Sequence, residues 1–127
     1  MPISSIPNSR NFITKITTYK KICSIQNSMT ILDDFIPIFV DMMDKGLKGR
    51  YNCTNPNPVD HNKILELYKE IVNPEFTWEN FTLDEQSKIL LSERSNNTLD
   101  TTKLESLYCI PNTIDSLKKV LSNYKLY

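Results

Sequence analysis

Glycine is scarce in this sequence, which has only Gly46 and Gly49 among its 127 residues. A dinucleotide-binding turn needs several glycines between a strand and a helix, because the backbone must approach a pyrophosphate closely at the helix N-terminus. The two glycines here lie close together in the chain, without that context. The sequence therefore predicts no cofactor-binding residues in this chain.

The sequence also has no excess of positive or negative charge, and it has no long apolar run. Fifteen Lys and Arg residues balance fifteen Asp and Glu residues, so no overall field attracts nucleic acid. No apolar run approaches the roughly 18 residues that a membrane-spanning helix needs. We therefore expect neither a nucleic-acid partner nor a membrane partner.

Cysteine and histidine are too few for a metal site. Cys23, Cys53 and Cys109 contain no C-x-x-C pair, and His61 is the only histidine. An odd number of widely spaced cysteines is typical of reduced thiols, which predicts a cytoplasmic protein. His61 follows a helix-capping Asp60, so we expect it to have a local structural role and no catalytic one.

The length predicts one domain over residues 1–127. The spacing of apolar residues along the sequence predicts a mostly helical α+β fold with two or three short strands. Apolar residues recur at helical spacing from Ile31 to Asp44, although Pro37 predicts a kink or a start near Asp34. Further helices are expected near 12–16, 61–72, 82–91, 101–108 and 113–124, and short strands at 22–25 and 50–54. Expected helix caps are Thr30, Asp60, Thr82, Asp100 or Thr101, and Thr113.

The core should form between the long helix and the last one. Ile31, Phe35, Phe39 and Met43 are expected to share one face, and Leu117 and Leu121 to pack against it.

Two groups of side chains leave a functional and a structural interpretation open. The first is the run from Arg94 to Asp100, in which Ser95 and Asn96 follow the guanidinium. It suits a bound phosphate or carboxylate, although residues of these types more often form a solvated turn that caps the next helix. The second group is Phe76, Trp78 and Phe81, whose rings suit stacking on a nucleotide base but are more often part of a core.

Six motifs occur together, and in one order, in a known family. They are Asn11–Ile16, Asn27–Asp33, Asn52–Pro56, His61–Leu65, Phe76–Phe81 and the stretch from Gln86 through Arg94–Asp100. From about Met1 to Ser122 the chain resembles the carboxyl-terminal part of the nucleotide-sugar 3,5-epimerase/4-reductases, which make activated L-rhamnose. That family belongs to the extended short-chain dehydrogenase/reductases and is found in plants and large DNA viruses. The resemblance implies a substrate-binding carboxyl-terminal lobe without a complete Rossmann sheet.

The resemblance also implies a site. Arg94 would pair with the diphosphate of a UDP- or dTDP-linked deoxy sugar, supported by Ser95 and Asn96. The sugar end would be lined by Asn11, Ser28 and Met29.

The complete family enzyme is expected to use NADPH and a catalytic Tyr-x-x-x-Lys. No Tyr of this chain is followed four residues later by Lys, so the resemblance implies a truncated chain that is inactive alone and contains no catalytic residue. A separately encoded Rossmann half or a second copy would then be its protein partner. The alternative is a non-catalytic helical interaction module.

Overall fold

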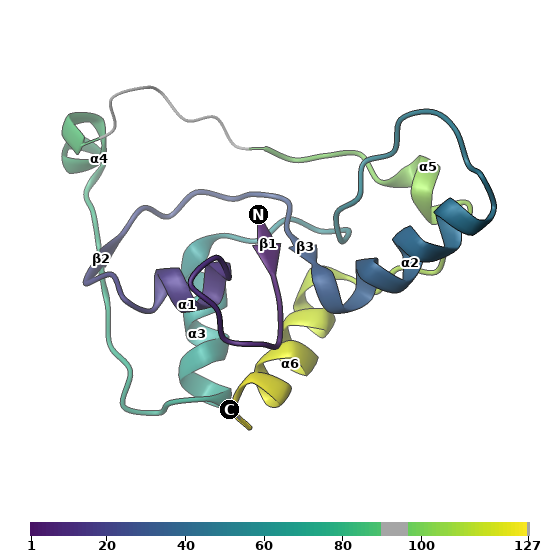
Figure 1. The fold of residues 1–127 in the computed structure, drawn as a ribbon. Helices are drawn as coiled ribbons and strands as arrows, with labels where there is room; N and C mark the ends of the chain where they lie inside the picture. The colour runs from purple at the N-terminus through teal and green to yellow at the C-terminus, as the bar shows by residue number, and fades with distance from the viewer. Residues whose placement is uncertain (90–96, 127) are drawn as a thin grey trace.

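The structure is a computed structural model that describes residues 1–89 and 97–126 (Figure 1). Short strands alternate with helices along the first third of the chain, and helices dominate the rest. The elements are β1 (Pro2–Ile3), α1 (Phe12–Ile16), β2 (Lys21–Ile22), β3 (Thr30–Ile31), α2 (Leu32–Asp44), α3 (His61–Ile71), β4 (Glu79–Asn80), α4 (Leu83–Ile89), α5 (Thr102–Glu105) and α6 (Thr113–Tyr124). The expected mixed, mostly helical composition with short strands is thus present.

The main core lies where α3 and α6 pack side by side beneath β1 and β3 (Figure 1). Both helices begin at a side-chain cap: Lys63 N donates to Asp60 Oδ1 at 2.7 Å, as predicted, and Asp115 N donates to Asn112 Oδ1 at 2.9 Å. The predicted cap Thr113 is wrong, because its hydroxyl donates instead to Pro56 O at 2.9 Å. The buried cluster comprises Ile3, Ile13, Met29, Ile31, Val59, Ile64, Leu67, Leu117, Val120 and Leu121.

A second core cluster lies between α2 and the segment around α5. Phe35 and Leu104 are fully buried there, and Phe39 and Met42 pack against them. The prediction for Phe35 is confirmed, but that for Met43 is wrong, since its side chain is 71% exposed. Phe35, Phe39 and Met43 are four residues apart, and each such step advances about 40° beyond a full turn around the helix axis. Met43 therefore points away from the core, whereas Met42 faces it.

Helix α2 begins and ends close to the predicted residues. It starts at Leu32 and continues through Pro37, so the expected start near Asp34 is wrong. The predicted cap Thr30 is wrong too, because its hydroxyl donates to Cys53 O at 2.8 Å. The helix ends where Gly46, at φ 63°, takes the left-handed conformation expected of it, and Leu47 N donates to Met42 O.

Each of the four strands has two residues, and they form two parallel pairs. β1 pairs with β3 and β2 pairs with β4. The strand predicted at 50–54 is wrong: Asn55 N, just after it, donates to Met29 O, but no ladder forms along the segment. The strand predicted at 22–25 is reduced to Lys21–Ile22.

Candidate functional site

Arg94, Ser95 and Asn96, the predicted diphosphate-binding residues, lie outside the described residues. The segment that follows them is held against the chain at Asn27 and Ser28. Ser28 N donates to Asn97 O at 2.7 Å, and Leu99 N donates to Ser28 Oγ at 2.9 Å. Asn97 N also donates to Asn27 Oδ1 at 3.2 Å. The Ser28 hydroxyl, predicted to face the sugar, therefore positions this backbone.

The described residues that precede the Arg94 run contact the same part of the chain. Lys21 Nζ lies 3.2 Å from Glu85 Oε2 of α4 and 5.8 Å from the centre of the Phe81 ring. Phe81 N donates to Ile22 O at 3.0 Å. The chain thus contacts the segment 21–28 both before and after residues 90–96.

Asn11 and Met29, the other two predicted sugar-binding residues, have structural contacts. Asn11 caps α1 through Ile13 N, and its amide nitrogen donates to Ser4 O at 2.6 Å and to Ile6 O at 3.0 Å. Met29 is fully buried in the main core. Their contact with a sugar stays a prediction.

A hollow of about 430 Å³ opens beside α1, close to the segment 21–28. It is bordered by aromatic rings, by two lysines and by a few apolar and sulfur-containing side chains. These residues are Met1, Phe12, Lys15, Ile16, Tyr19, Lys21, Ile22, Cys23, His61 and Phe81. Two of its residues, Lys21 and Phe81, also form the contact that precedes residues 90–96.

The lining of this hollow suits a ligand that combines a flat ring with negative charge. Aromatic faces stack on nucleotide bases, and ammonium groups pair with phosphate oxygens. Lys15 is exposed on α1, and Tyr19 is exposed in the turn that follows this helix. Lys21 forms an ion pair with Glu85. Neither lysine was predicted from the sequence. The helical spacing of positions 12, 15, 16 and 19 could have indicated Lys15, whereas Lys21 lies on β2 and has no such local signal.

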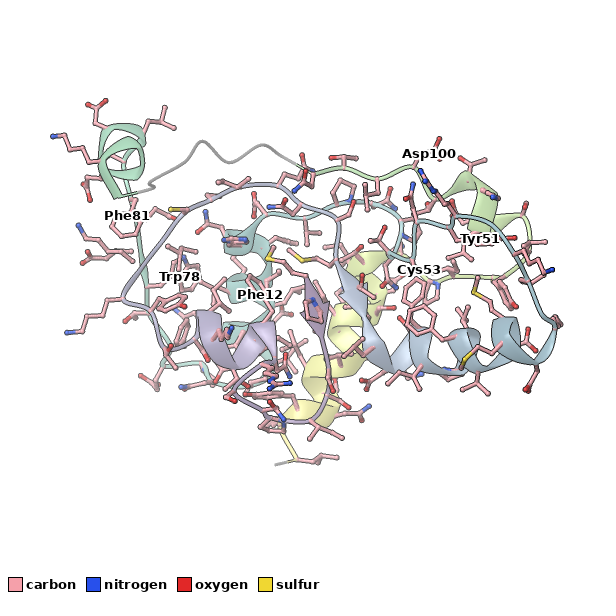
Figure 2. The ribbon with its side chains drawn as sticks, turned by 45° about the horizontal axis from the view of Figure 1, so that its top comes forward. Phe12, Tyr51, Cys53, Trp78, Phe81 and Asp100 are labelled. Atoms are coloured by element: carbon pink, nitrogen blue, oxygen red, sulfur yellow. The ribbon has the colours of Figure 1, made fainter. Side chains whose placement is uncertain are left out.

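The three aromatic residues at 76, 78 and 81 divide between core and hollow; Figure 2 labels Trp78 and Phe81. Phe76 and Trp78 stack with ring centres 5.9 Å apart and pack against the buried residues Ile16, Ile22 and Leu65. Trp78 Nε1 donates to Asn62 Oδ1 at 2.9 Å. The core interpretation is therefore confirmed for these two rings, and Phe81 borders the hollow.

His61 also borders the hollow, with its ring centre 5.2 Å from that of Phe12. Within residues 1–89 and 97–126, no three His, Cys, Asp or Glu side chains form a group that could hold a metal ion. Nor is any helix in that part of the chain long and apolar enough to cross a membrane.

Several known proteins are similar to this chain over most of its length. A bifunctional dTDP-4-dehydrorhamnose 3,5-epimerase/dTDP-4-dehydrorhamnose reductase of Arabidopsis thaliana is 56% identical over 107 residues, which are 84% of this chain and 36% of that protein. A trifunctional UDP-glucose 4,6-dehydratase/UDP-4-keto-6-deoxy-D-glucose 3,5-epimerase/UDP-4-keto-L-rhamnose-reductase of the same plant is 50% identical, over 98% of this chain and 18% of its own length. No protein-family model matches the sequence.

Solved structures share the fold. The crystal structure of a UDP-rhamnose synthase from Acanthamoeba polyphaga mimivirus matches with a TM-score of 0.91 at 48% identity, over 97% of this chain and 43% of that one. A dTDP-4-dehydrorhamnose reductase of Yersinia enterocolitica, 13% identical, matches with a TM-score of 0.68 and supports the fold alone. The chain spans less than half the length of each of these relatives. By sequence and by fold, the chain is similar to the carboxyl-terminal region of the epimerase/reductases of rhamnose synthesis.

Proposed function

We propose that this chain is the nucleotide-sugar-binding lobe of a 4-keto-6-deoxy-sugar 3,5-epimerase/4-reductase. Its ligand would be a UDP- or dTDP-linked deoxy sugar, since the plant relatives are named for both kinds of substrate. The observation that carries the proposal is the hollow beside α1, where Phe12, Tyr19 and Phe81 offer rings and Lys15 and Lys21 offer positive charge. A base stacked on the rings would bring its diphosphate to the lysines.

The diphosphate would also be bound by Arg94, with Ser95 and Asn96 donating to the remaining oxygens. A guanidinium matches two phosphate oxygens with two parallel hydrogen bonds, which an ammonium cannot do. Support comes from the residues on either side, because Glu85 contacts Lys21 and Asn97 pairs with Asn27. Both anchors lie on the strand and loop that border the hollow.

The hydride for the 4-keto group would come from NADPH held by another part of a complete enzyme. The glycines of this chain do not fit a pyrophosphate-binding turn, since both follow the C-terminal end of α2 and neither lies at the N-terminus of a helix. The chain's own part would be to bind and orient the nucleotide sugar, and alone it would reduce nothing.

The proposal is tested by titrating the isolated chain with UDP in a calorimeter and measuring the binding affinity. Tyr19 is 57% exposed, so Tyr19→Ala should leave the fold intact and weaken UDP binding about tenfold, within the range for loss of one base–aromatic stack. Lys15→Ala should weaken binding by about two- to fivefold, as for an exposed ion pair. The control is Lys119→Ala, on the exposed side of α6. Equal affinity for all four proteins would refute the site.

An alternative role as an interaction module is favoured by one observation, the exposed apolar side chains of α2. The two roles are compatible, because a substrate-binding lobe must pack against the half that holds the cofactor.

A further inference from the structure

The Lys21 ammonium, one of the two positive charges that border the hollow beside α1, already has a carboxylate partner. Its Nζ lies 3.2 Å from Glu85 Oε2, and both side chains are 41% exposed. The other lysine of this hollow, Lys15, forms no ion pair within residues 1–89 and 97–126. The chain itself therefore supplies a counter-charge to one of the two cations before any ligand binds.

The fold brings this carboxylate to the hollow in two steps. β4 pairs with β2, and Phe81 N, one residue after β4, donates to Ile22 O at 3.0 Å. Thr82 then caps α4, because its Oγ1 accepts from Glu85 N at 3.2 Å. Phe81 borders the hollow, and so does Lys21. The ion pair of Glu85 with Lys21 thus lies beside the place where a ligand would bind.

Helix α4 contributes little to the buried core. Figure 1 shows it away from α3 and α6, and Leu83, its first residue, is 84% exposed. An exposed ion pair shifts an equilibrium by at most about fivefold. A stronger ligand for the Lys21 ammonium would therefore displace Glu85 without disturbing the core.

A diphosphate is such a ligand. It carries more negative charge and more acceptor oxygens than one carboxylate does. In the hollow it would meet both Lys15 and Lys21, whereas Glu85 pairs with Lys21 alone. The exchange of Glu85 for a diphosphate is accordingly favourable at this position.

We propose that Glu85 occupies, in the free chain, the place at Lys21 that a phosphate of the ligand takes, and that binding exchanges one for the other. The Glu85 carboxylate is then an internal competitor that lowers the affinity of the site. Because linkage is reciprocal, binding also weakens the contact between α4 and β2. The proposal rests on the proposed function, since it describes how ligand binding at the same hollow is regulated.

Calorimetric titration of the chain with UDP, uridine and inorganic pyrophosphate tests this exchange. Glu85→Gln keeps the shape of the side chain and removes its charge. It should strengthen the binding of UDP and of pyrophosphate by about two- to fivefold, the range for an exposed ion pair. Uridine has no phosphate, so its affinity should stay the same. In a Lys21→Ala background the gain from Glu85→Gln should disappear, because no ammonium is left to compete for.

Glu79→Gln is the matched control. Glu79 is exposed and stands opposite Lys21 in the register of β2 and β4. Among the described residues, Lys21 forms its ion pair with Glu85 and none with Glu79. Removal of the Glu79 charge therefore measures general repulsion of the ligand, which salt screens at an exposed site. It should strengthen UDP binding clearly less than Glu85→Gln does.

Unchanged or weaker UDP binding by Glu85→Gln would overturn the proposal and leave the nucleotide site standing. Equal gains from Glu85→Gln and Glu79→Gln would also overturn it, and so would a gain that persists in Lys21→Ala, because both results indicate simple repulsion. A gain seen with pyrophosphate while UDP binds no better than pyrophosphate would uphold the exchange and refute the nucleotide assignment. Failure of both UDP and pyrophosphate to bind either protein would refute the two proposals together.

Discussion

Asn55 connects three parts of the molecule through one buried amide. Its side chain is 1% exposed. Asn55 Oδ1 accepts from Ile31 N at 2.9 Å, and Nδ2 donates to Asp34 Oδ2 at 3.0 Å and to Pro111 O at 3.1 Å. Ser116 Oγ donates to the same Asp34 oxygen. The amide therefore joins the start of α2, the loop before α6 and α6 itself.

Asn55→Ala should lower the free energy of unfolding by about 2.5–5 kcal/mol. A buried donor left without an acceptor, here Ile31 N, costs about 1–3 kcal/mol. The lost hydrogen bond to the Asp34 carboxylate adds about 1.5–3 kcal/mol, the range for bonds to a charged group. The upper end of the sum is reduced because Ser116 still donates to Asp34.

Urea denaturation followed by circular dichroism measures this loss. The control is Asn52→Ala, which removes an exposed amide with a single bond to Asp100 O and should cost less than about 1 kcal/mol. Asn55→Asp keeps the acceptor for Ile31 N but places a carboxylate against that of Asp34. It should be strongly destabilised at neutral pH and partly recover as the pH falls, because a protonated carboxyl donates again. A loss below about 1 kcal/mol for Asn55→Ala would refute the reasoning.

Four further predictions concern the two cores, the Tyr108 hydroxyl, Arg94 and the activity of the isolated chain. Leu117→Ala, in the main core, should cost about 2–5 kcal/mol in urea denaturation, whereas Met43→Ala should stay within about 0.5 kcal/mol in the isolated chain. Tyr108 donates to Asp41 at 2.6 Å, which raises the pKa of Tyr108 from 10.0 to about 12. Its contribution to stability is present below pH 10 and lost as the pH rises through about 12, so Tyr108→Phe should flatten the alkaline fall in stability. In an enzyme completed with a cofactor half, Arg94→Ala should weaken nucleotide-sugar binding by about 1.5–3 kcal/mol. Arg94→Lys should restore the binding only in part. Equal affinities of the wild type and Arg94→Ala would show that Arg94 belongs to a solvated turn and does not bind the ligand. The isolated chain should oxidise no NADPH with a 4-keto-6-deoxy nucleotide sugar, and oxidation above a protein-free control would contradict this.

Helices were predictable because their signals are local. Asp60 and Thr82 precede their helices and accept the expected backbone bonds, from Lys63 N and Glu85 N. Strands were less predictable, because two residues are enough to form a pair here and the partner lies far away in sequence. Thr30 illustrates the difficulty: it resembles a cap, but its hydroxyl bonds to Cys53 O, 23 residues later.

The candidate site was predicted only in part, for the same reason. Its rings and lysines come from α1 and the turn after it, from β2, from the start of α3 and from the residue after β4, and only the fold brings these segments together. Sequence patterns around Asn11 and Met29 drew attention to residues that the structure uses for capping and for the core. The contribution of Arg94 stays a prediction, because the described residues end at 89 and resume at 97.

The position of the main core has a consequence for how the chain folds. Ile64 and Leu67 lie before residues 90–96, and Leu117 and Leu121 lie after them, yet all four are in one buried cluster. Neither portion can bury its apolar face without the other, so both should fold in a single cooperative step. Two separate polypeptides, 1–89 and 97–127, should accordingly each be unfolded alone and regain helical structure when mixed, which would make this lobe a split-protein pair.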